Sequence, residues 1–118
     1  DERYSMSNYR YGIYASNDGN SSQGISFNSI TRYDYDTGKK DVFSLSKHDA
    51  VEEPIFVPKS HDSNEGVGYI IALSYLGKEN RSDLMIFDAE NLSSGPIARA
   101  TLPHRIPYGF HGNWRQGT

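Results

Sequence analysis

The 118-residue sequence predicts an all-β fold that corresponds to about two blades of a β-propeller. Short runs of β-branched and aromatic residues alternate with clusters of Gly, Asn, Asp and Ser, a pattern typical of strands joined by turns. No stretch keeps apolar residues at helical spacing for longer than about one turn, and residues 48–52 and 89–92 are the candidates for such turns. The fold class therefore depends on strands alone.

Strands are expected at seven places, and residues 17–22 are expected to form a loop because they are Asn, Asp, Gly and Ser. In chain order, the expected strands are residues 9–15, 25–35, 40–45, 54–57, 68–75, 83–88 and 97–102.

A weak internal repeat indicates the propeller. Residues 29–38 form a strand pattern that enters an Asp-x-Gly turn, and residues 84–92 form one that enters a turn led by Asp. Asp36 and Asp88 lie 52 positions apart (88 − 36), within the range of propeller repeats. A blade is a small antiparallel sheet that stacks on its neighbours, so about two blades predict a part of a larger ring.

Composition excludes several classes of function. A net charge of −3, with Lys and Arg scattered along the chain, argues against a nucleic-acid partner. The absence of Cys excludes disulfides, Cys-based zinc sites and thiol catalysis, and it fits the expected cytoplasmic location. No apolar run has membrane-spanning length, and no phosphate-binding loop or GxSxG motif is present.

His111 is the candidate metal ligand. It lies between Phe110 and Gly112 after a Pro-Tyr-Gly turn, and the alternative is a core histidine with satisfied hydrogen bonds. Gly109 and Gly112 indicate either a close backbone approach or turns with positive φ. Phe110 and Trp114 are candidates for an apolar wall that excludes water. One histidine cannot hold a catalytic metal, so the other ligands are expected outside these residues.

Four motifs occur in one order along the chain and resemble the C-terminal end of the carotenoid cleavage oxygenases. They are EPIFVP at 53–58, NEGVGY at 64–69, SDL with FDA at 82–84 and 87–89, and PYGFHG at 107–112. The bacterial lignostilbene dioxygenases are the most similar branch, favoured by RSDL at 81–84 and GNW at 112–114. The resemblance extends over the whole chain but covers only about the last quarter of a typical member.

The resemblance implies a seven-bladed β-propeller with one Fe(2+) on its axis, held by four histidines that are oriented by three glutamates. Such enzymes use O2 to cleave a C=C bond of a conjugated or phenolic substrate, a stilbenoid or an apocarotenoid, into two carbonyl products. His111 corresponds to the last iron ligand and Glu53 to one of the orienting glutamates, although which histidine it orients stays open. The residues alone favour a different interpretation of Glu53, that of a surface acid beside Glu52.

The resemblance also implies that residues 1–118 are a C-terminal segment, with three further histidines and the remaining blades encoded upstream of Asp1. The alternative is a non-catalytic truncated β-propeller module that acts in self-assembly or protein interaction, since two isolated blades would expose unpaired strand edges. His48, His61 and His104 are expected to be exposed loop residues that bind no metal.

Overall fold

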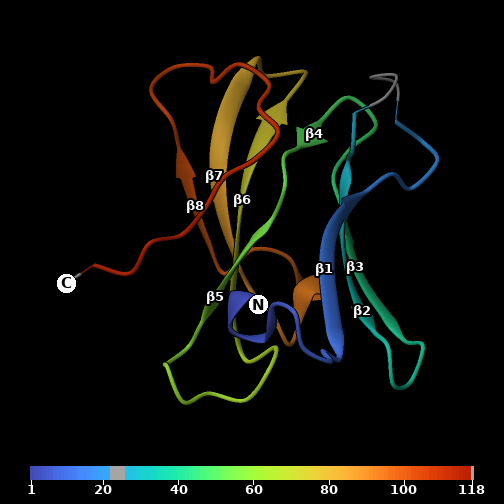
Figure 1. Cartoon of the computed structure of the whole chain (residues 1–118). Helices are drawn as coiled ribbons and strands as arrows, with labels where there is room; N and C mark the ends of the chain where they lie inside the picture. Colours follow the sequence, from blue (N-terminus) through green and yellow to red (C-terminus); the bar gives the residue numbers. More distant parts are fainter. Residues whose placement is uncertain (22–25, 118) are drawn as a thin grey trace.

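The computed structural model describes residues 1–21 and 26–117, which form two antiparallel sheets facing each other (Figure 1). Sheet A contains, in this order, β1 (Tyr11–Ser16), β2 (Ser29–Asp34) and β3 (Lys40–Ser44). Sheet B contains β4 (Ala50–Val51), β5 (Ile55–Pro58), β6 (Gly68–Leu76), β7 (Arg81–Asp88) and β8 (Ala98–Thr101). The helical elements in this part of the chain are two short 3-10 turns, η1 (Glu2–Tyr4) and η2 (Leu92–Ser94). The all-β prediction with about two blades is confirmed.

The core lies between the two sheets. Along β6, every second residue is buried, as expected for a strand with one face turned toward a core. Ile70 of β6 and Phe87 of β7 are fully buried, and Ile30 from sheet A is 1% exposed. The Phe87 ring lies 5.0 Å from that of Phe43, which joins β7 to β3 across the core. Packing of the sheets thus depends on large apolar side chains.

The predicted strands all have counterparts, with differences at their ends. Residue 25 lies outside the described residues, and β2 begins at Ser29. The loop prediction is confirmed for residues 17–21, while residue 22 lies outside the described part. The helical turn expected at 48–52 is wrong, because Ala50 and Val51 pair with Tyr75 and Ser74 of β6 as strand β4. The turn expected at 89–92 is displaced, since η2 begins only at Leu92.

The internal repeat is present, but its register differs from the prediction. β2 and β7 are the equivalent strands, each flanked on both sides within its sheet, and they end at Asp34 and Asp88. The Asp34 carboxylate accepts the backbone N–H of Asp36 at 3.0 Å, and Asp88 accepts that of Glu90 at 2.9 Å. Asp34, and not Asp36, is therefore the residue equivalent to Asp88, because the last residue of each strand forms the turn.

One edge of sheet B is interrupted near the candidate site. β4 and β5 both pair with β6, and residues 52–54 between them leave the strand conformation. Glu52 still donates its backbone N–H to the Leu73 carbonyl at 3.0 Å. Pro54 has no N–H to donate, which is consistent with an interrupted ladder. This break carries Glu52 and Glu53.

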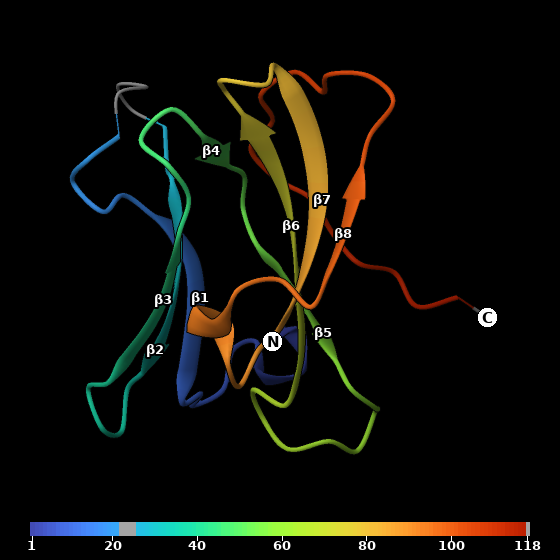
Figure 2. The ribbon, with the colours of Figure 1, turned by 180° about the vertical axis from the view of Figure 1, so that it is seen from behind.

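The C-terminal segment, residues 102–117, has no regular secondary structure and runs along sheet B (Figure 1). Seen from behind, its end points away from sheet A (Figure 2). Within the described residues, no helix has both the length and the apolar character needed to cross a membrane.

Candidate metal centre

His111 and Glu53 meet, although 58 positions separate them in the sequence. His111 Nδ1 lies 2.8 Å from Glu53 Oε2. An ionised carboxylate only accepts hydrogen bonds, so Nδ1 carries the proton and donates it. In the neutral ring, the lone pair then resides on Nε2, which is the nitrogen left for a metal ion. Glu53 thus selects the tautomer of His111 that is suited to coordination.

Neither side chain of this pair is buried by the described residues. The His111 side chain is 85% exposed and that of Glu53 is 49% exposed. Within the described residues, His111 thus lies outside the apolar core. The ring is held at one nitrogen by Glu53 and otherwise projects from the surface of this part of the protein.

The segment that carries His111 is anchored to sheet B at its start. The backbone N–H of Ile106 donates to Ser82 Oγ at 2.9 Å, and Ser82 is buried in β7. The ring of Tyr108 packs edge-on against Tyr75 of β6, with 5.5 Å between the centroids. The Arg105 guanidinium lies over the Tyr75 ring at 4.9 Å, within the range of a cation–π contact. These contacts determine where the residues before His111 lie.

The glycines on either side of His111 allow close approach rather than unusual backbone angles. Neither is among the described glycines with positive φ. A Cβ on Gly109 would lie 3.0 Å from Glu52 Oε2, and one on Gly112 would lie 2.9 Å from Ile55 Cδ1. Gly109 also donates its backbone N–H to Glu52 Oε1 at 2.8 Å. Of the two explanations expected for these glycines, the close approach is confirmed.

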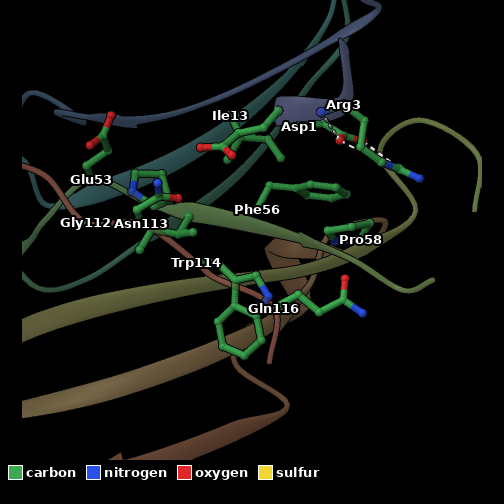
Figure 3. Close-up of a pocket in the computed structure, with 13 residues that line it drawn as sticks. Asp1, Arg3, Ile13, Glu53, Phe56, Pro58, Gly112, Asn113, Trp114 and Gln116 are labelled. Atoms are coloured by element: carbon green, nitrogen blue, oxygen red, sulfur yellow. Dashed lines mark hydrogen bonds and ion pairs between the residues drawn. The ribbon is translucent and has the colours of Figure 1, made fainter. Parts of the chain in front are cut away.

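A cavity of about 340 Å³ adjoins Glu53 (Figure 3). Phe56 and Ile13 contribute apolar surface, while the Arg3–Asp1 ion pair contributes charge. Trp114 lines the cavity, but Phe110 is 81% exposed, so it does not form the expected apolar wall within these residues. The full lining is Asp1, Glu2, Arg3, Ile13, Glu53, Pro54, Ile55, Phe56, Pro58, Gly112, Asn113, Trp114 and Gln116.

The other histidines lie apart from His111. His61 and His104 are exposed as expected, and His61 Nδ1 contacts the neighbouring Asp62 at 3.0 Å. His48 is half-buried, so the expectation that it is exposed is wrong. Among residues 1–21 and 26–117, no group of three or more His, Cys, Asp or Glu side chains is placed to hold a metal ion. In this part of the protein, His111 is the candidate ligand with an orienting carboxylate from a distant segment.

Four residues that anchor the His111 segment were not identified from the sequence: Glu52, Tyr75, Ser82 and Tyr108. The one available signal was the pair of acids before Pro54. Adjacent residues in a regular strand point to opposite faces, but a proline can end that regularity and allow both acids to turn to one side. The contacts of Tyr75, Tyr108 and Ser82 depend on tertiary structure, and no local sequence pattern indicates them.

Two blade-like sheets, together with a histidine on the C-terminal segment that contacts a carboxylate between β4 and β5, define part of a propeller with a candidate metal ligand. Residues 1–116 match the family described as retinal pigment epithelial membrane protein (RPE65). The chain belongs to this family, that of the carotenoid cleavage oxygenases.

Individual relatives agree with that assignment. Lignostilbene-alpha,beta-dioxygenase isozyme III of Sphingomonas paucimobilis is 48% identical over 91 residues, which are 77% of this chain and 19% of that protein. Apocarotenoid-15,15'-oxygenase of Synechocystis is 34% identical over 108 residues, covering 92% of this chain and 22% of that protein. The crystal structure of Pseudomonas brassicacearum lignostilbene dioxygenase superposes with a TM-score of 0.91 at 33% identity, covering 99% of this chain and 26% of that one. The chain thus spans about a fifth of the length of the curated relatives it matches.

Proposed function

We propose that this chain is the C-terminal portion of a non-haem iron(II) dioxygenase that uses O2 to cleave a C=C bond of a stilbenoid into two carbonyl products. The observation that carries the proposal is the 2.8 Å contact between His111 Nδ1 and Glu53 Oε2. A carboxylate that fixes the tautomer of a histidine and leaves Nε2 for a metal is the usual arrangement around histidine ligands in proteins. Similarity to a lignostilbene dioxygenase and to an apocarotenoid oxygenase supports the reaction class.

The donor set fits iron as far as this chain extends. His111 would be one ligand, and Glu53 would orient it without touching the metal. Imidazole nitrogen is a suitable ligand for Fe(2+), and neutral ligands leave open positions at the ion. When bound, the iron supplies the activation of O2, while His111 and Glu53 contribute position and a fixed tautomer.

The rest of the site would come from other blades. Within the described residues no complete metal site exists, and the chain covers only about a fifth of the relatives' length. We therefore propose that the remaining histidine ligands and blades belong to the same propeller outside residues 1–118. The cytoplasmic location stays a prediction that rests on the absence of Cys.

The proposed substrate is a small conjugated or phenolic molecule. Identity is 48% to a lignostilbene dioxygenase and 34% to an apocarotenoid oxygenase, which favours a stilbenoid over an apocarotenoid. The apolar side chains of Phe56, Ile13 and Trp114 beside Glu53 are compatible with an aryl-substituted substrate.

Replacement of His111 by Ala in the full-length protein tests the proposal. We expect loss of bound iron, measured by metal analysis, and loss of stilbenoid cleavage, measured by product chromatography. His61→Ala is the matched control, because His61 also contacts a carboxylate but lies in an exposed loop. Retained iron and turnover in His111→Ala would refute the ligand role, and tight stoichiometric iron in residues 1–118 alone would refute the shared site.

A further inference from the structure

Two neighbouring carboxylates turn to the same segment of the chain. Glu53 accepts a hydrogen bond from His111, and Glu52 accepts one from the backbone N–H of Gly109, each at 2.8 Å. In a regular strand, successive side chains would point to opposite faces. The break between β4 and β5 removes this restriction, so both acids reach the residues around His111.

Two backbone hydrogen bonds hold Glu52 and the preceding residue, Val51, in place. Its own N–H donates to the Leu73 carbonyl at 3.0 Å, and the N–H of Val51 donates to the Phe27 carbonyl at 2.8 Å. The first contact ties Glu52 to β6, and the second ties its neighbour to the residues before β2. The Glu52 carboxylate therefore extends from a backbone that hydrogen bonds hold beside β6 toward a segment that has no ladder of its own.

The surroundings of the Glu52 side chain favour a specific contact. Glu52 is half-buried and shares a small cavity lining with Tyr75, Ile106 and Tyr108. A hydrogen bond to an ionised carboxylate is stronger than one between neutral groups, and partial exclusion of water strengthens it further. Gly109 allows this bond, because a Cβ at that position would lie 3.0 Å from Glu52 Oε2.

We infer that Glu52 is a positioning residue for His111, which it holds in place through the backbone of Gly109. The bond lies two residues before His111, and Glu53 then orients the ring itself. Glu52 thus restrains the position of the backbone, while Glu53 restrains the rotation and tautomer of the imidazole. This inference rests on the proposed function, because a displaced His111 has a chemical consequence only if it binds iron.

The test uses the full-length, iron-loaded protein with two readouts. Glu52→Ala is expected to weaken iron binding about tenfold, the lower end for residues that support a metal ligand, measured by competition with a chelator. Deuterium exchange of the peptide containing Gly109 is expected to accelerate, because its N–H loses its acceptor. Glu52→Gln keeps an acceptor oxygen and is expected to stay within about threefold of the wild type. Glu90→Ala removes an exposed glutamate elsewhere and is expected to change neither readout.

Gly109→Ala tests the same contact from the other side and guards against a Glu52→Ala variant that misfolds. Its methyl group would lie 3.0 Å from Glu52 Oε2 and push the carboxylate back by a few tenths of an ångström, so we expect a loss of iron affinity no larger than that of Glu52→Ala. In the double variant Glu52→Ala/Gly109→Ala, the loss should equal that of Glu52→Ala alone, since both changes act on one interaction.

Additive losses, or Glu52→Ala indistinguishable from Glu90→Ala in both readouts, would overturn the inference. Equal losses in Glu52→Gln and Glu52→Ala would also overturn it, because the effect would then follow charge rather than the hydrogen bond. A wild-type protein that binds no iron would instead refute the proposed function, and exchange at Gly109 would still decide whether Glu52 restrains the segment.

Discussion

Replacement of Glu53 by Ala separates stability from metal binding. The change removes the acceptor of the 2.8 Å hydrogen bond from His111 Nδ1. Within residues 1–118 the side chains are 85% and 49% exposed, so in this part of the protein solvent screens the pair and its contribution to the free energy of unfolding is about 0–1 kcal/mol. Loss of an orienting carboxylate typically lowers metal affinity roughly 10- to 100-fold, or about 1.4–2.8 kcal/mol. The effect should therefore be larger on iron than on folding.

Two assays on the same variants measure this difference. Chelator competition gives the iron affinity of the full-length protein, and urea denaturation gives its stability. Glu53→Gln retains an oxygen that accepts from Nδ1 and should fall between the wild type and Glu53→Ala. Unchanged iron affinity in Glu53→Ala, within about twofold, would refute the orienting role, and so would a loss of affinity that is fully explained by unfolding.

Three further predictions concern the framework of the site. Phe87→Ala should lower the free energy of unfolding by about 3–5 kcal/mol in urea denaturation, because Phe87 is fully buried. The hydrogen bond from Arg10 holds the pKa of Asp34 well below its ordinary value of 3.8. The folded state thus binds fewer protons than the unfolded one in acid, so the stabilisation is present at neutral pH and is lost as pH falls below about 4. In Asp34→Asn, the Tm from thermal melts should depend less on pH across that range. A Tm that depends on pH as in the wild type would contradict the pairing. Ser82→Ala should lower the free energy of unfolding by about 1 kcal/mol and accelerate hydrogen–deuterium exchange of the Ile106 amide, because the Ile106 N–H donates to Ser82 Oγ. An Ile106 amide that stays protected from exchange would refute this.

The strands were predictable because their physical cause is local. Residues 68–76 alternate in burial along the strand, although Ile70 to Leu73 form a continuous apolar run. The strand was predictable because it is rich in β-branched and aromatic residues and follows a stretch of turn-forming residues. Strand β4 was not predictable, since two residues are too few to show a period. Ala50 and Val51 are extended because β6 offers them a pairing edge, whereas the sequence around them equally suits a helical turn.

The candidate site divides in the same way. His111 and Glu53 were identified because they lie in motifs that resemble those of a known family. The residues alone did not indicate that the two side chains are in contact. Glu52 was missed because its role depends on a break in the ladder and on a glycine 57 positions away. The register of the repeat was assigned wrongly to Asp36 because composition defines strand ends poorly. In the turn, the Asp34 carboxylate accepts the hydrogen bond that the backbone N–H of Asp36 donates.

The location of His111 on a segment without secondary structure has a consequence for how the site keeps its geometry. A strand would hold a ligand through its ladder, but after Leu102, whose backbone N–H donates to the Ser82 carbonyl at 3.0 Å, residues 103–117 form no strand. Their order must come from side chains of sheet B: Ser82 and Tyr75 hold the start of the segment, and Glu52 and Glu53 hold its middle. Each of these contacts is modest, and together they replace the ladder. Because the restraint is spread over β6, β7 and the break beside β6, changes in sheet B should alter metal binding without touching His111.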